Sequence, residues 1–170
     1  PHERRRRIVR TTKGRLSDLF HMALHRLSPL LLVQYRYRRA TGRWFPRHRP
    51  VTFDEKLLWM MLYWQHPLKS ECADKYSVRK YVASRAGETL LPALHGVYES
   101  PGDIDFRKLP ERFVLKVTHG CGYNIFCRDR QRFDHEDAVR KLRRWMRVDP
   151  GWLFGEAHYS SIRPRVICEE

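Results

Sequence analysis

The chain has 170 residues, of which 42% are hydrophobic, and 34 Lys and Arg against 19 Asp and Glu give it a formal net charge of +15. This composition excludes general disorder, because the apolar fraction suffices for a core, and the length fits one domain or a small domain with an extension. The four cysteines lack the pairing of a metal site or a disulfide framework, and no apolar run approaches the ~20 residues of a membrane span. We therefore expect a cytoplasmic protein, at most peripheral at a membrane.

Residues 1–50 are expected to form a basic helical region. Apolar residues at helical spacing from Leu16 to Leu27 predict a helix, Ser28-Pro29 interrupts it, and a second helix follows over residues 30–39. Arginine clusters favour attraction to polyanions, whether nucleotide, nucleic acid or an acidic bilayer surface. A solvated basic flank explains the same arginines, and nucleic acid is not the partner that we expect.

Residues 51–88 are expected to form a helical segment that leads into the rest of the fold. Thr52 and Glu55 have the spacing of a capping box, so they predict a helix through the apolar run 57–62, buried on most sides and closed by Pro67. A further helix is predicted over residues 70–85, ending near Gly87.

Residues 89–170 differ in pattern from the helical residues before them, and we expect them to form a small sheet. The apolar runs 90–98, 112–117, 124–128 and 165–170 are typical of strands, and residues 134–147 show helical periodicity. The fold class expected is therefore α+β, with a small antiparallel sheet and flanking helices.

Lys116 ends a predicted strand just before the glycine loop His119-Gly120-Cys121-Gly122. Glycines allow backbone N–H groups to approach phosphate oxygens, and a lysine on a strand adds a fixed positive charge, so the segment suits a phosphate clamp. It is not a Walker A loop, because the Gly-Lys-Ser/Thr sequence is absent. An ordinary hairpin with a surface lysine is the alternative.

Several motifs in this order resemble the first, nucleotide-binding half of the ATP-grasp fold, and specifically the TupA-like ATP-grasp family, named for teichuronopeptide biosynthesis. They are Thr52-Phe-Asp-Glu-Lys-Leu, Asp74-Lys-Tyr-Ser-Val-Arg-Lys-Tyr-Val, Asp105-Phe-Arg-Lys-Leu-Pro-Glu-Arg-Phe-Val-Leu-Lys116, the glycine loop and Pro164-Arg-Val-Ile-Cys-Glu-Glu170. Cys121 departs from the small residue expected in the loop.

The resemblance implies a nucleotide site. It implies that Lys75 and Lys116 reach ATP phosphates, that His119, Gly120 and Gly122 belong to a loop that folds over them, and that Glu169 and Glu170 enter the hinge against adenine and ribose. It also implies that Mg²⁺ accompanies ATP, with ligands in a second half of the fold after residue 170. Because the chain starts at Pro1 and stops within a strand-like run, we expect an inactive fragment, truncated at the adenine hinge.

The activity that the resemblance implies is ATP-dependent ligation of a carboxylate to an amine, in the synthesis of a cell-surface polysaccharide or teichuronopeptide. The sequence names neither substrate. Two alternatives stay open: a basic module that binds nucleic acid or a membrane surface, and a glycosyltransferase-like protein. The second has no supporting metal motif beyond the chance spacing of Asp103 and Asp105.

Overall fold

The computed structural model describes residues 12–151 and 156–170, and this part of the chain has an α+β fold. Its α-helices are α1 (Thr12–Leu27), α2 (Pro29–Thr41), α3 (Phe53–Tyr63), α4 (Pro67–Ala73), α5 (Ser77–Ala86) and α6 (His135–Met146). Its strands are β1 (Leu94–Tyr98), β2 (Phe113–Val117), β3 (Asn124–Cys127) and β4 (Val166–Glu169). The predicted fold class is confirmed. Among the described helices, none combines the length and apolarity needed to cross a bilayer.

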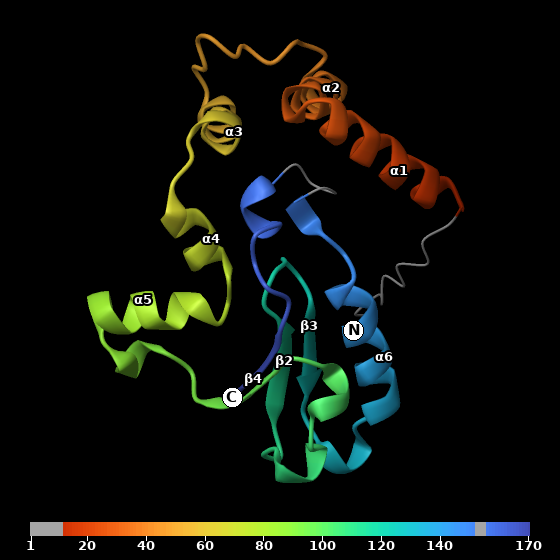
Figure 1. Cartoon of the computed structure of the whole chain (residues 1–170), viewed down its shortest axis with the longest axis vertical. Helices are drawn as coiled ribbons and strands as arrows, with labels where there is room; N and C mark the ends of the chain where they lie inside the picture. Colours follow the sequence, from red (N-terminus) through yellow and green to blue (C-terminus); the bar gives the residue numbers. More distant parts are fainter. Residues whose placement is uncertain (1–11, 152–155) are drawn as a thin grey trace, which may run out of the picture.

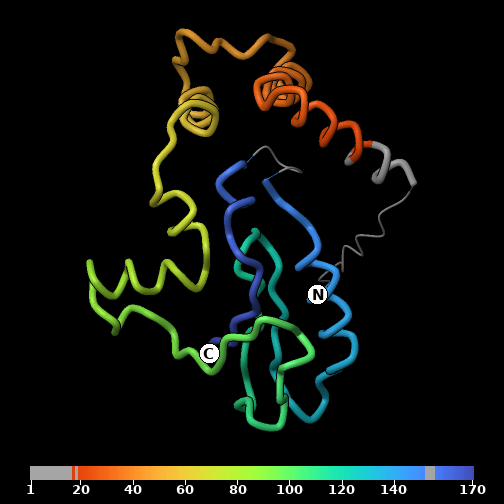
Figure 2. Tube along the Cα trace, viewed as in Figure 1, coloured from red at the N-terminus to blue at the C-terminus, as the bar shows by residue number. Residues whose placement is uncertain are grey.

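Helices α1, α2 and α3 form an arm at one end of the molecule, and the sheet with α6 forms a body at the other (Figure 1). Helices α4 and α5 run along one side between them, as the chain trace in Figure 2 shows. Within the arm, both polar atoms of the Gln34 side chain bond to the backbone of Phe45, at 3.0 and 2.9 Å. This pairing ties the segment after α2 back onto the helix.

The four-stranded antiparallel sheet has the order β1-β4-β2-β3, which places the last strand of the chain at its centre. Strand β4 pairs with β1 on one side and β2 on the other, and all four of its residues are buried. The strand that is last in sequence therefore joins the β1 edge to the β2–β3 hairpin.

The two faces of the sheet have different chemistry, because side chains alternate along each strand. Phe113, Leu115 and Val117 of β2 are buried on one face, where Leu142 of α6 and Cys168 of β4 join them in the core. Cys168 is a fully buried core residue, and this burial raises the pKa of its thiol to about 12. The opposite face of the sheet carries Lys116 and Glu169.

The helix predicted over residues 70–85 is in fact two helices, and that prediction was wrong. Helix α4 ends at Ala73 and α5 begins at Ser77. The Asp74 carboxylate accepts hydrogen bonds from the Tyr76 N–H at 2.9 Å and the Ser77 hydroxyl at 2.8 Å. These local bonds turn the chain where a continuous helix would otherwise form.

Two other predictions fail at the level of single elements. The helix after Thr52 was expected to be buried on most sides, but Glu55 is the buried residue of α3. Strand β1 begins at Leu94 rather than at residue 90, because residues 88–90 form a 3₁₀ turn and Pro92, which lacks an N–H, follows it. The capping box itself is present, with Thr52 accepting from Glu55 N.

Candidate functional site

Lys116 and Glu169 meet on the sheet face opposite α6. Lys116 of β2 lies across from Ile167 of β4, and Glu169 lies two residues further along, on the same face. The Lys116 Nζ donates to Glu169 Oε2 at 2.6 Å. The Glu169 side chain is 6% exposed and that of Lys116 is 27% exposed, so the lysine is the more accessible member of this ion pair.

Glu169 has a second cationic partner that sequence reasoning missed. Arg79 of α5 donates from Nη1 to Glu169 Oε1 at 2.5 Å and from Nη2 to the Pro92 carbonyl at 2.8 Å. Arg79 belongs to the same motif as Lys75, Asp74-Lys-Tyr-Ser-Val-Arg. Its place in that motif was the signal in the sequence that could have identified it.

Lys75 lies between α4 and α5 and connects them to the end of β2. Its backbone N–H donates to the Thr118 carbonyl at 3.3 Å. Its Nζ donates to the Val117 carbonyl at 2.9 Å and also to the Gly120 carbonyl. Burial, with Lys116 nearby as a smaller cause, lowers the pKa of Lys75 below its ordinary value.

A buried ion pair fixes the corner that carries Lys75. Asp74 is 5% exposed, and its Oδ2 accepts from Arg165 Nη2 at 2.9 Å. The Arg165 guanidinium also lies over the Tyr76 ring, 4.4 Å from its centroid. Because Arg165 immediately precedes β4, this contact joins the α4–α5 corner to the central strand.

The glycine loop follows β2 directly, and two of its glycines have distinct physical roles. A Cβ on Gly120 would lie 2.7 Å from the ring of Tyr123, so a side chain there forces the loop to shift. Gly122 has φ +76°, a left-handed conformation that glycine adopts without strain, and a Cβ there would meet open space. Cys121, between them, is exposed.

The His119 side chain points to the base of the loop rather than to its surface. It is 2% exposed, and its Nε2 donates to the Val148 carbonyl at 2.8 Å. Burial lowers the pKa of His119, and the bond to Val148 partly opposes that shift. A phosphate contact from this imidazole requires the loop to rearrange, and the role expected for His119 stays a prediction.

Four of the seven residues expected to bind nucleotide therefore come together: Lys75, Lys116, Gly120 and Glu169. Gly122 lies in the open part of the loop. Glu170 is exposed and uses its backbone N–H to pair with the Ala93 carbonyl at 3.0 Å. The site therefore contains two lysine ammonium groups, backbone carbonyl groups and one carboxylate. The ammonium groups suit phosphate oxygens, and the other groups suit polar hydrogen-bond partners.

The residues present fit a nucleotide better than a protein-bound metal. Within residues 12–151 and 156–170, no group of three His, Cys, Asp or Glu side chains is placed to hold a metal ion. The one carboxylate at the site, Glu169, is already paired with Lys116 and Arg79. The described residues around Lys75 and Lys116 therefore do not form a Mg²⁺ site.

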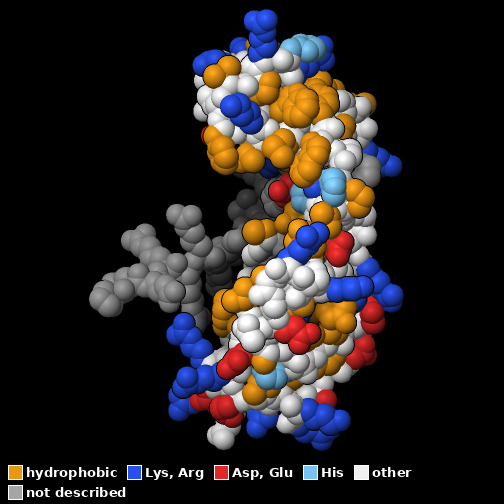
Figure 3. All heavy atoms as spheres, turned by 90° about the vertical axis from the view of Figure 1, so that its left-hand side faces the viewer, with side chains coloured by type: hydrophobic (Ala, Val, Ile, Leu, Met, Phe, Trp, Pro, Cys, Tyr) orange, Lys and Arg blue, Asp and Glu red, His pale blue; other side chains and the backbone are white. Residues whose placement is uncertain are grey.

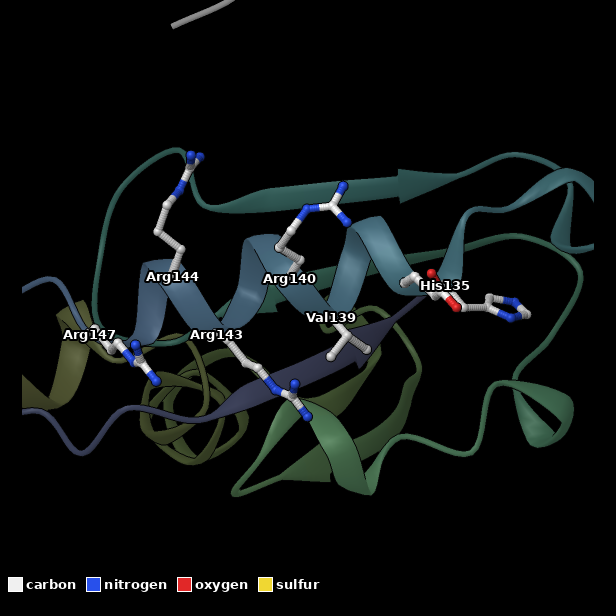
Figure 4. A pocket seen from close by; sticks show the side chains of 7 residues that line it. His135, Val139, Arg140, Arg143, Arg144 and Arg147 are labelled. Carbon is white, nitrogen blue, oxygen red and sulfur yellow. The ribbon is translucent and has the colours of Figure 1, made fainter. Parts of the chain in front are cut away.

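A second basic feature lies on the outer side of α6, where four exposed arginines line a depression: Arg140, Arg143, Arg144 and Arg147. Figure 4 shows their side chains spreading in different directions from the helix instead of converging on one point. Arg140 is also paired with Asp137 of the same helix. This surface has the character of a solvated helix face.

Comparison with models of known protein families identifies a family for this chain. A family model described as TupA-like ATPgrasp matches residues 55–170. No curated protein and no solved structure matches the chain.

Proposed function

The chain belongs to the TupA-like ATP-grasp family, and we propose that it provides the nucleotide-binding part of an ATP-dependent carboxylate–amine ligase. The seven residues expected to contact nucleotide all lie within the matched range. The substrates proposed are a carboxylate and an amine used in building a cell-surface polysaccharide or teichuronopeptide. The protein would act in the cytoplasm, with its basic region near an acidic membrane surface.

The observation that carries the proposal is that Lys116 and Glu169 meet on one face of the sheet, with Lys75 held at the end of β2 close enough to interact electrostatically with both. The Lys75–Val117 bond joins residues 42 apart in sequence, and the Lys116–Glu169 bond joins residues 53 apart. An ordinary surface lysine is not expected to bond to a buried partner so distant in the sequence. The Lys75 ammonium group also lies against the glycine loop, at the Gly120 carbonyl, and that loop would supply backbone N–H groups for phosphate.

Nucleotide binding would exchange partners at this site. The Nζ of Lys75 now donates to the carbonyls of Val117 and Gly120, and the Nζ of Lys116 donates to Glu169. Phosphate oxygens would replace the two carbonyls at Lys75, because a charged oxygen is a stronger acceptor than a neutral carbonyl, and they would compete with the Glu169 carboxylate for Lys116. Arg79 would continue to hold Glu169, leaving that side chain at the adenine end of the site.

The chemistry proposed for the family is acyl activation followed by acyl transfer. The substrate carboxylate attacks the γ-phosphorus of ATP, giving an acyl phosphate and ADP. The amine then attacks the acyl carbon and expels inorganic phosphate, leaving an amide after loss of a proton. The lysines would contribute by offsetting charge on the phosphoryl oxygens, which is the main task of a protein in such a transfer.

A calorimetric titration of MgATP into the chain and into Lys116→Met tests the proposal. The variant is expected to bind about 10- to 100-fold more weakly, the effect of losing one hydrogen bond to a charged group. Lys108→Met is the matched control, because the Lys108 side chain is 84% exposed and pairs with Asp105, which is not a residue of the site. Equal affinity of all three proteins for MgATP would contradict the proposal.

The alternatives make different predictions. A basic binding module would bind acidic polymers in a salt-sensitive manner, and Lys116→Met would leave that binding unchanged. A glycosyltransferase-like protein would bind a sugar nucleotide in preference to ATP. Titrating MgATP, a sugar nucleotide and an acidic polymer under the same conditions therefore distinguishes the three functions.

A further inference from the structure

Helix α3 is an apolar helix that other elements of the fold cover only in part. Several of its large side chains are exposed, among them Phe53 at 74%, Leu57 at 47% and Met60 at 39%, with Trp64 just after the helix at 44%. Their spacing of four, three and four residues places them along one side of the helix. Trp59 and Tyr63, also exposed, lie beside this stripe with their ring centroids 5.4 Å apart and their planes tilted by 46°. A helix that is apolar on most sides normally packs against something.

The surroundings of α3 are strongly basic. Residues 19–69 contain nine Lys and Arg but two acidic residues, Asp54 and Glu55. Glu55 is buried and engaged by Tyr37 and by the helix cap, so it adds little negative charge to the surface. Arg43, Arg47 and Arg49 lie exposed in the loop just before the helix.

Tryptophan residues are exposed on this surface, and tryptophan is typical of the boundary between water and lipid. Trp44 is 63% exposed and lies under the guanidinium of Arg38, at 4.6 Å. Lys69 lies 5.7 Å from the ring of Trp64. Figure 3 shows the side of the molecule where α3 lies, with hydrophobic side chains gathered in its upper part and Lys and Arg around them.

We propose that α3 and the loop before it, residues 42–64, dock on the surface of an anionic lipid bilayer. Tryptophan and tyrosine are enriched at membrane interfaces, and an apolar helix flanked by Lys and Arg lies in the interface plane with its apolar side chains among the acyl chains. The helix is not a membrane span. This inference rests on the arm alone and does not depend on the nucleotide site.

The positive charge of the arm favours an anionic bilayer over a second copy of the chain as the partner that binds to α3. A second copy would bring the same basic residues against the arm, and like charges in one interface oppose association. An anionic bilayer supplies both an apolar layer and the opposite charge. Each Lys or Arg near such a surface contributes attraction, and the aromatic residues add buried apolar area.

Sedimentation with lipid vesicles tests the inference on the full chain. Vesicles of equimolar phosphatidylglycerol and phosphatidylcholine are expected to bind the protein, and vesicles of phosphatidylcholine alone to bind it much more weakly. Arg47→Glu/Arg49→Glu is expected to weaken binding to the anionic vesicles by about tenfold or more. Arg143→Glu/Arg144→Glu on α6 changes the net charge by the same amount at another exposed surface, and is expected to cause a smaller loss.

A second pair of variants separates the apolar contribution from charge. Trp59→Ser/Trp64→Ser is expected to reduce vesicle binding and to abolish the part that remains at high salt. Leu90→Ser, at a side chain that is 68% exposed outside the arm, is the matched control and is expected to bind like the original chain. Circular dichroism of each variant checks that the fold is retained.

Three outcomes would overturn the inference. The first is equal weakening by the two charge-reversal pairs, which would mean that only the overall net charge attracts the protein. The second is vesicle binding that Trp59→Ser/Trp64→Ser leaves unchanged. The third is a stable dimer in light scattering that this tryptophan variant converts to monomer, which would identify a second copy as the occupant.

Discussion

At the scale of single residues, Glu169 is the centre of the candidate site. Two cations from different elements hold its two carboxylate oxygens, Arg79 from α5 and Lys116 from β2. A buried carboxylate with paired cations tolerates the loss of one partner poorly, because the charge that remains is poorly solvated. If Lys116 leaves Glu169 for a phosphate, Arg79 becomes the residue that keeps this carboxylate in place.

Arg79→Met is therefore expected to destabilise the fold by about 1.5–3 kcal/mol, the contribution of a hydrogen bond to a charged group. Urea unfolding monitored by tryptophan fluorescence measures the change. Arg85→Met, at an exposed position near the end of the same helix, is the matched control and is expected to stay within about 0.5 kcal/mol of the original chain. A similar loss in both variants would mean that the Arg79–Glu169 pair has no special role in stability.

His119 makes stability depend on pH. Its pKa is lowered from 6.5 in the folded chain, mainly by burial, so the unfolded chain binds a proton more readily. The neutral imidazole contributes to the free energy of unfolding, and this contribution is fully present above pH 6.5 and is lost as the pH falls below 6.5. His25 and His158 have pKa values lowered by burial as well, so they share the dependence.

The free energy of unfolding is thus expected to fall as the pH is lowered from above 6.5 to about 5. His119→Asn is expected to lower stability at neutral pH and to make this fall smaller. His95→Asn, at an exposed residue of β1, controls for the loss of a histidine. Denaturant unfolding at a series of pH values measures the slope, and an undiminished slope in His119→Asn would contradict the assignment.

At the scale of elements, sequence patterns predicted those helices and strands whose signals are local. The break at Ser28-Pro29, the Thr52 cap and the helix beginning after Asp134 all appear in the structure. The break between α4 and α5 was missed, because it depends partly on the bond from Lys75 N–H to the distant Thr118 carbonyl. Propensity along the chain contains no information about that partner.

The cap of α3 gives a prediction at this scale. The Glu55 carboxylate accepts from the Tyr37 hydroxyl at 2.6 Å and from the backbone N–H groups of Thr52 and Val51 at 3.0 and 2.8 Å. These bonds, that of Tyr37 first, lower the pKa of Glu55 from 4.5 to about 2. Because the folded pKa is depressed, the associated stability is present above pH 4.5 and is lost as the pH falls toward 2.

Glu55→Gln is accordingly expected to weaken the acid dependence of unfolding between pH 4.5 and pH 2. Thr52→Ala removes the other half of the cap and is expected to cost about 1 kcal/mol. Ser84→Ala, at an exposed position near the end of α5, is the matched control for losing a hydroxyl. Thermal unfolding followed by circular dichroism measures all three variants, and unchanged acid sensitivity in Glu55→Gln would contradict the role given to this carboxylate.

At the scale of the whole molecule, the arrangement of the site depends on sheet topology. The motifs around Lys75, Lys116 and Glu169 were visible in the sequence, but their ion pairs were not. Those pairs require β4 to lie between β1 and β2, so that Glu169 comes beside Lys116 and within reach of Arg79. Strand order is a property of the completed sheet, which local patterns do not specify. The exposed apolar surface of α3 was missed for a related reason, because the sequence shows that a helix is apolar and not what covers it.

A ligand that joins elements across the molecule should stabilise the whole fold. MgATP bound by Lys75 and Lys116 would connect the α4–α5 corner to β2, and binding to the folded chain alone raises its stability by mass action. At a hundred times the dissociation constant the gain is about 2.7 kcal/mol, which for a chain of this size raises the melting temperature by about 5–10 °C. Lys75→Met/Lys116→Met is expected to lose this shift, whereas Lys80→Met/Lys108→Met, a pair at exposed positions, is expected to retain it. Differential scanning calorimetry with and without MgATP measures the shift. If the site-directed pair keeps the full shift, ATP binds elsewhere on the molecule, because the stabilisation would then be independent of the two lysines.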